Sequence, residues 1–131
     1  MSSIFDQFSL ATRVAIVTGG SGLLGAQFCR TLAEAGAAVV VADANLPAAE
    51  VVAQWICEAG GQAIAVPVDV TRPDSVQAMV DTTLDRFARL DVLVESPAEI
   101  AESALDSEAV AKESEYASDA TPAVRSAVLL N

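Results

Sequence analysis

Residues 18–25 read TGGSGLLG, between the apolar run VAIV at 14–17 and the helical pattern AQFCRTLAEAG at 26–36. Glycines in a turn that leads from a strand into a helix predict a loop that binds phosphate. The first turn of a helix leaves N–H groups unpaired and carries partial positive charge, and a pyrophosphate satisfies both. The alternative is a glycine turn that only connects the strand to the helix.

The residues of this turn have distinct expected tasks. Gly19 lets the chain turn tightly off the strand, Gly22 lets the backbone approach the phosphates, and Gly25 lets the helix pack against the strand. Thr18 and Ser21 offer hydroxyl groups that stabilise the turn or contact phosphate.

The chain around this turn alternates between strand and helix patterns. Short apolar runs predict strands at 13–18, 37–43, within 62–70, and at 90–94. Helical spacing, proline starts and glycine ends predict helices between them, over 23–36, from Pro47 to Gly60, and from Pro73. This alternation predicts an α/β fold, with right-handed βαβ crossovers and a parallel sheet of about four strands in the order 3-2-1-4, flanked by helices.

Each predicted helix has an apolar side that we expect to face the sheet. These sides are Leu24, Phe28, Leu32 and Ala35 in the first helix, Val51, Val52, Trp55 and Ile56 in the second, and Val76, Met79, Val80, Thr83, Leu84 and Phe87 in the third.

Composition limits the classes of function. The 131 residues suit one domain, and 53% apolar residues indicate a folded chain. A net charge of −11 argues against nucleic acids and anionic membranes as partners, because both need a basic surface. No apolar stretch is long enough to span a bilayer, and the start lacks the pattern of a secretory signal, so we expect a cytoplasmic protein.

Cysteine and histidine content narrows the chemistry. We expect Cys29 and Cys57 to be two reduced, partly buried thiols, rather than a disulfide or a metal pair. The sequence has no histidine, which removes Ser-His-Asp and Cys-His catalysis and leaves no plausible zinc or other metal site.

Two aspartates follow predicted strands. Asp43 ends the second strand at the offset expected of an acid that binds ribose hydroxyls and repels a 2′-phosphate. Neither the turn nor Ala44 and Asn45 supplies an arginine, so NAD is favoured over NADP; a helix-capping or turn aspartate is the alternative. Asp69 and Val70 follow the third strand, where a side chain reaches an adenine; the alternative for Asp69 is to stabilise the turn.

TGGSGLLG, VVVAD at 39–43, DVT at 69–71 and F-x-x-LDVLV at 87–94 together resemble the short-chain dehydrogenase/reductase family over residues 10–94. The resemblance implies a Rossmann-type domain that binds NAD or NADP, oxidoreductase activity on alcohols and ketones, and dimers or tetramers. It also implies roles for individual residues. The pyrophosphate would be lined by Gly19, Ser21, Gly22, Leu24 and Gly25, the adenosine ribose would be bound by Asp43, and the adenine would be flanked by Asp69 and Val70.

The chain departs from the family pattern in two places. The spacing T-G-x-x-G-x-x-G resembles the extended members, whereas the short members have T-G-x-x-x-G-x-G, which would place glycine at Leu23. D-V-T and LDVLV resemble the short members, so the subfamily stays open. After the fourth strand the family has N-N-A-G, and this chain has Glu95, Ser96, Pro97 and Ala98. We expect these residues to add a charge near the phosphates and to remove a backbone donor.

The catalytic pattern of the family does not map onto this chain. The family requires a serine at a later strand end and Tyr-x-x-x-Lys on a helix, where the ammonium lowers the phenol pKa. Tyr116 is the only tyrosine, and Ala120 stands four residues after it. Lys112 precedes Tyr116 by four residues, in the reverse order. We therefore predict no catalytic residue and expect an exposed surface pair.

The last part of the chain has a different composition. Residues 95–131 hold eight acids and two bases and are rich in alanine, serine and glutamate. We expect a Rossmann-type domain over 1–94 and an acidic tail over 95–131 that is weakly helical near 100–113 or disordered. The change at Glu95 suggests a truncated or frameshifted family member. An exposed fourth strand would favour self-association, through the sheet edge or the helices, or packing of the tail over that edge.

Three functions are consistent with these patterns. The first is an NAD-dependent oxidoreductase by ancestry, which acts on an alcohol or ketone only when other chain segments complete it. The second is a non-catalytic NAD-binding or regulatory module, and the third is an interaction fragment that binds no nucleotide.

Overall fold

The computed structural model describes residues 3–96 and the backbone of 128–130. In these residues the elements are α1 (Ile4–Gln7), β1 (Val14–Thr18), α2 (Leu23–Glu34), β2 (Ala38–Asp43), α3 (Leu46–Glu58), β3 (Gln62–Pro67), α4 (Pro73–Phe87), β4 (Val92–Glu95) and β5 (Val128–Leu130). The expected helix near 100–113 and the pair Lys112 and Tyr116 lie outside the described residues, as do Pro97 and Ala98.

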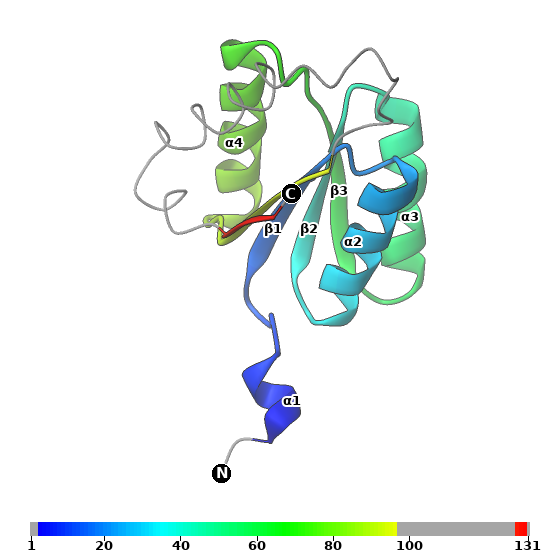
Figure 1. Cartoon of the computed structure of the whole chain (residues 1–131), viewed down its shortest axis with the longest axis vertical. Helices are drawn as coiled ribbons and strands as arrows, with labels where there is room; N and C mark the ends of the chain where they lie inside the picture. The colour runs from blue at the N-terminus through cyan, green and yellow to red at the C-terminus, as the bar shows by residue number, and fades with distance from the viewer. Residues whose placement is uncertain (1–2, 97–127, 131) are drawn as a thin grey trace.

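The strands form one parallel sheet in the order β3-β2-β1-β4-β5. Helices α2 and α3 cover one face and α4 covers the other, so the fold has three layers (Figure 1). The predicted order 3-2-1-4 is confirmed. β5 is an addition to the predicted sheet of about four strands. It pairs with β4, with Val94 opposite Leu130, so part of the tail covers the edge that the sequence left exposed.

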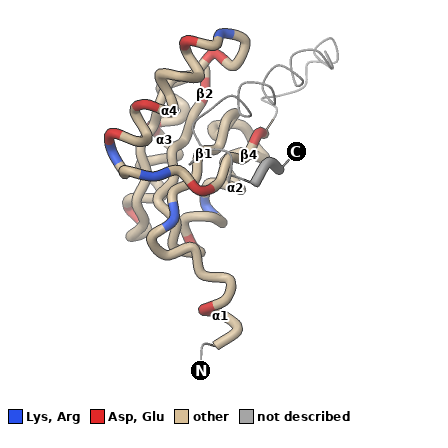
Figure 2. Tube along the Cα trace, turned by 90° about the vertical axis from the view of Figure 1, so that its left-hand side faces the viewer, with Lys and Arg blue, Asp and Glu red and all other residues tan. Residues whose placement is uncertain are grey.

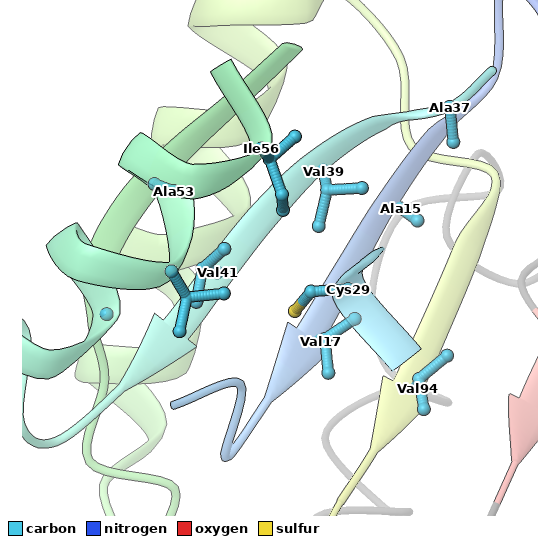
Figure 3. Packing of buried hydrophobic residues seen from close by; sticks show 11 residues of the cluster. Ala15, Val17, Cys29, Ala37, Val39, Val41, Ala53, Ile56 and Val94 are labelled. Carbon is cyan, nitrogen blue, oxygen red and sulfur yellow. The ribbon is translucent and has the colours of Figure 1, made fainter. Parts of the chain in front are cut away.

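The core lies on both faces of the two central strands. β1 and β2 are buried along their whole length, as continuous apolar runs predict for parallel strands covered on both sides. On one face Val17, Val39 and Val41 pack with Cys29 of α2 and Ile56 of α3 (Figure 3). On the other face the sheet packs against Met79 and Val80 of α4, on the side of that helix that the spacing predicts.

Local chemistry sets the helix boundaries. The Asn45 side chain accepts a hydrogen bond from the N–H of Ala48 at 3.2 Å, and proline lies in the first turn of α3. Gly36, expected to end the first helix, has a φ of +106° directly after α2. α4 ends on Ala88 in the left-handed region, with a φ of +64°.

The predicted apolar sides are wrong in part for α2 and α3. Leu24, Val51 and Trp55 are exposed, while the buried residues of α2 are Gly25 and Cys29. Small side chains let α2 approach the sheet closely, and this close approach leaves the larger neighbouring side chains at the rim. Cys57 is exposed rather than partly buried, and both cysteines are free thiols as expected.

Charged residues of the described part lie mainly on the helices and at turns, with the arginines scattered among acids (Figure 2). In the described residues, no helix combines the length and the apolar character that a membrane crossing requires.

Candidate functional site

Buried polar side chains gather at the carboxyl edge of the sheet, which is where the C-terminal ends of its parallel strands lie. Of the five buried polar residues within 3–96, four lie here: Thr18 at the end of β1, Asp43 at the end of β2, and Glu95 and Ser96 at the end of β4. Thr18 is in register with Ala42 on one side and with Glu95 on the other. The sheet therefore places these groups in a row beside the glycine turn.

The turn connects β1 to α2 through two backbone features. Gly19 has a φ of +66°, a conformation that glycine adopts without cost, and its carbonyl accepts a hydrogen bond from the N–H of Gly22 at 3.1 Å. Gly22 is the N-cap of α2, and no side chain caps this helix end. The first N–H groups of α2 thus face the carboxyl edge, as an anion-binding helix start requires.

Gly25 and Gly20 are glycines because the fold leaves no room for a side chain. A Cβ at Gly25 would lie 2.0 Å from the carbonyl oxygen of Gly19. The contact is with the turn itself, whereas the sequence suggested packing of the helix on the strand. A Cβ at Gly20 would lie 2.8 Å from Val41 Cγ1 and 3.0 Å from the carbonyl oxygen of Val17. Sequence reasoning missed Gly20, although its signal was the second glycine of the turn.

Gly22 differs from these glycines. Its φ of −69° and ψ of 169° are extended backbone that any residue adopts. A Cβ there would contact only the Gly19 carbonyl oxygen, at 3.3 Å, so the fold makes a weak demand for glycine at this position. The missing side chain instead leaves open space at the N-terminus of α2, where a ligand backbone or phosphate could approach.

Asp43 is tied to the glycine turn. Its Oδ2 accepts hydrogen bonds from the Ser21 hydroxyl at 2.6 Å and from the Ser21 N–H at 3.1 Å. Its Oδ1 accepts one from the N–H of Asn45 at 2.9 Å, and the helix cap of α3 is Asn45 itself. Asp43 is therefore a turn aspartate as well as a candidate ribose acid, because each carboxylate oxygen accepts about two bonds.

Asp69 and Val70 lie in the loop after β3. The N–H of Val68 donates to the carbonyl of Asp43 at 3.1 Å, which ties this loop to the same edge. The Asp69 carboxylate is exposed and accepts bonds from the hydroxyl and N–H of Thr71, which lower its pKa. Val70 is half-buried against the α4 face of the sheet. The turn role of Asp69 is thus present, and its role towards adenine stays a prediction.

Leu24 lies in the first turn of α2, and its side chain is exposed. A groove of about 430 Å³ begins at Ser21 and Gly22, runs between α2 and α3, and reaches Trp55. A second cavity of about 360 Å³ lies further along the same two helices, between Glu34 and Gly61, away from the carboxyl edge.

Glu95 occupies the carboxyl edge in an unexpected state. The sequence suggests an added charge here, but the residue is only 5% exposed, and burial raises the pKa of its carboxyl. Its Oε2 is buried and has no hydrogen-bond partner among the described residues. The backbone at this point is paired, since the N–H of Ser96 donates to the carbonyl of Thr18 at 3.1 Å.

Arg13, Arg89 and Asp91 form a charged cluster at the opposite edge, where the strands begin, and this cluster has a structural role. Asp91 accepts hydrogen bonds from the Arg89 guanidinium, from Arg13, and from the N–H of Val14 at the start of β1. These bonds, that of Arg89 first, lower the pKa of Asp91.

Burial raises the pKa of the Cys29 thiol to about 12, so this thiol is no nucleophile near neutral pH. In residues 3–96, no group of three or more potential ligands could hold a metal ion.

Comparison with known proteins gives one family. A family model described as short chain dehydrogenase matches residues 13–119. Cis-4-hydroxycyclohexanecarboxylate dehydrogenase of Sinomonas cyclohexanicum is 47% identical over 86 residues, which are 66% of this chain and 34% of that protein. The 7alpha-hydroxysteroid dehydrogenase of Escherichia coli (strain K12) is 37% identical over 89 residues, 68% of this chain and 35% of that protein. The chain spans about a third of the length of the curated relatives it matches.

Solved structures agree with this match. A short-chain type dehydrogenase/reductase from Mycobacterium marinum has a TM-score of 0.68 at 38% identity, and the alignment covers 71% of this chain and 38% of that one. An oxidoreductase from Haemophilus influenza, solved with bound NAD, has a TM-score of 0.65 at 27% identity and covers 70% of this chain and 33% of that one.

Proposed function

This chain belongs to the short chain dehydrogenase family, and we propose that it binds NAD at the carboxyl edge of its sheet. Its relatives and structural neighbours are oxidoreductases. The observation that carries the proposal is the open position at Gly22, beside the uncapped start of α2 and next to the Ser21–Asp43 link. That combination brings room, N–H donors and the Asp43 carboxylate together at the glycine turn.

The residues present fit a dinucleotide. The N–H groups of the first α2 turn would hold the pyrophosphate, and Gly22 allows it to approach the backbone. Asp43 would accept a hydrogen bond from the adenosine ribose through Oδ1, which accepts only the Asn45 bond, whereas Oδ2 already accepts two bonds from Ser21. Asp69 and Val70 would flank the adenine from the loop after β3. Bound NAD would supply a hydride acceptor, and these residues would only bind it.

We propose a preference for NAD over NADP. The 2′-phosphate of NADP would lie beside the buried Asp43 carboxylate, and the two negative charges would repel each other. Ala44 and Asn45 follow Asp43 and bring no positive charge to the ribose.

We propose that an alcohol is oxidised, or a ketone reduced, only by a longer assembly that includes this NAD-binding site. The match covers about a third of each relative, and the single tyrosine of this chain is not followed by lysine at the fourth position. A non-catalytic NAD-binding module is the second candidate, and the same sequence observation favours it. The two differ in whether hydride transfer appears when the chain is supplied with alcohols.

Calorimetric titration of the chain with NAD and NADP tests the proposal. We expect saturable binding of NAD, weaker binding of NADP, and a smaller difference between them in Asp43→Asn. Asp85→Asn is the matched control, since Asp85 is an exposed aspartate on α4 away from this edge. Absence of binding to either cofactor would favour an interaction fragment and overturn the proposal. Nicotinamide absorbance with a panel of secondary alcohols then separates the enzyme from the binding module.

A further inference from the structure

Glu95 carries a buried carboxyl group that has no part in the NAD-binding roles proposed above. It is 5% exposed at the end of β4, and within the part of the chain that the structure describes its Oε2 has no hydrogen-bond partner. Burying a polar oxygen without a hydrogen bond is unfavourable. An unpaired carboxyl at a candidate binding site therefore suggests that its hydrogen-bond partner is a bound ligand, which lies outside the described residues.

Glu95 lies where the strand order reverses. Along the sheet, β2 and β3 follow β1 in one direction, while β4 and β5 lie in the other. In open α/β sheets, ligands bind in the crevice outside the carboxyl ends of the strands at this switch point. Thr18 and Glu95 are the register partners that end β1 and β4, so they form the two sides of that crevice.

The side chain of Glu95 lies close to the glycine turn. Neighbouring strands are about 4.8 Å apart, and Gly19 directly follows Thr18. Side chains alternate along a strand, so Glu95 shares the face of Leu93, as Thr18 shares the face of Ile16. The carboxyl and the Thr18 hydroxyl therefore lie on the same face, that of α4, one strand apart and beside the start of the glycine turn, which leads to α2 on the other face.

We propose that Glu95 makes dinucleotide binding proton-linked, because its protonated carboxyl donates a hydrogen bond to a phosphate or ribose oxygen in this crevice. The inference rests on the proposed function. Loss of the proton would remove that donor and place a negative charge one strand from the pyrophosphate. A dinucleotide would then bind the protonated protein more tightly than the ionised protein.

The direction of the pH dependence follows from the surroundings of Glu95. Burial raises the pKa of this carboxyl in the free protein, and a bound dianion would raise the pKa further. Affinity is full below the pKa of the free protein. It falls by at most about tenfold per pH unit as the pH rises towards the pKa of the complex.

The described elements around β4 bring no ionic partner to Glu95. β1 has no titratable residue, and the sequence of β5 is Val-Leu-Leu. Asp43 lies two strands away and is bonded to Ser21, and Asp91 is at the other end of the sheet. The charged residues of the two nearest helices are all exposed: Arg30 and Glu34 on α2, and Asp74, Asp81, Asp85 and Arg86 on α4. The sequence has no histidine, so few other groups titrate between about pH 5 and 8.

Calorimetric titration with NAD across this pH range tests the inference. Glu95→Gln is nearly isosteric and keeps a donor but cannot ionise, and Glu34→Gln is the matched control because Glu34 is exposed on α2. In wild type and Glu34→Gln we expect affinity to fall as pH rises. In Glu95→Gln we expect the affinity to stay flat. Titrations in buffers of different ionisation enthalpy would show proton uptake on binding to the wild type and none for Glu95→Gln.

The possible outcomes separate this inference from the proposed function. If NAD binds all three proteins with the same pH profile, or without proton uptake, the role of Glu95 is overturned and the proposed function stands. If NAD binds none of them at any pH, the proposed function fails, and the inference fails with it. If Glu95→Gln does not fold, the buffer series on wild type still decides, since absent proton uptake contradicts proton linkage.

Discussion

Ser21 donates two hydrogen bonds to a single oxygen of Asp43, which lies 22 residues further along the chain. One comes from its hydroxyl at 2.6 Å and the other from its backbone N–H at 3.1 Å. The bonds join the glycine turn to the end of β2. The candidate phosphate and ribose positions are therefore held in one rigid unit rather than on two separate loops.

Removing the Ser21 hydroxyl tests that link. Ser21→Ala keeps the N–H bond and loses the shorter one, so we expect the free energy of unfolding to fall by about 1.5–3 kcal/mol, the range for a hydrogen bond to a charged group. We also expect weaker NAD binding, because the turn loses its anchor. Urea denaturation measures the first effect. Thr82→Ala is the control, since that exposed hydroxyl bonds only a carbonyl of its own helix. Equal stability of Ser21→Ala and wild type would contradict the link.

The glycines of the turn should separate into a structural and a binding type. Gly25→Ala places a Cβ 2.0 Å from the Gly19 carbonyl oxygen, so we expect a loss of at least about 1–3 kcal/mol in unfolding free energy. Gly22→Ala meets its neighbour at 3.3 Å, so the fold should persist while NAD affinity falls about tenfold or more, for a loss of about 1.4 kcal/mol. Denaturation and calorimetry on both variants measure this contrast. Unchanged NAD affinity in a folded Gly22→Ala protein would count against the phosphate assignment.

Asp91 should stabilise the fold only when it is ionised. Its pKa is lowered, by Arg89 first, so its contribution is present above the ordinary aspartate pKa of about 3.9 and is lost as pH falls through the folded value. We expect Asp91→Asn to lose about 1–3 kcal/mol at neutral pH, because its side chain is 16% exposed and also bonds the N–H of Val14. The gap to wild type should close in acid.

Denaturation of both proteins at a series of pH values measures that gap. Asp85→Asn serves as the control, because Asp85 is exposed and should change stability by less than about 0.5 kcal/mol. A gap for Asp91→Asn that is constant down to strongly acidic pH would show that the carboxylate charge is not the cause.

The two thiols should differ in reactivity. Cys57 is exposed, whereas Cys29 is buried with a pKa of about 12 and its thiol donates to the carbonyl of Gly20. We expect a disulfide reagent to label one thiol quickly in the native protein and the second only after unfolding. Cys57→Ser should show no fast phase, and fast labelling of that variant would contradict the burial of α2 on the sheet.

Sequence alone predicted the sheet well, because β1 and β2 are continuous apolar runs that only a sheet covered on both faces can bury. It could not predict which side of α2 faces the sheet. Leu24 fits the apolar spacing, but the helix approaches through Gly25 and Cys29, whose small size is a tertiary property. The placement of the site residues at the ends of β1, β2 and β4 depended on contacts between distant segments. Asp43 and Ser21, or Glu95 and Thr18, meet only once the strands are in register.

The most direct test of the central claim is a titration of isotope-labelled chain with NAD, followed by the shifts of its backbone amide signals. Binding at the carboxyl edge predicts the largest shifts in the amides of residues 19–25, with further shifts at Asp43 and in the loop of Asp69 and Val70. The amides around Arg13 and Asp91, at the opposite edge, should stay in place. Shifts confined to that opposite edge, or no shifts at saturating NAD, would contradict the account.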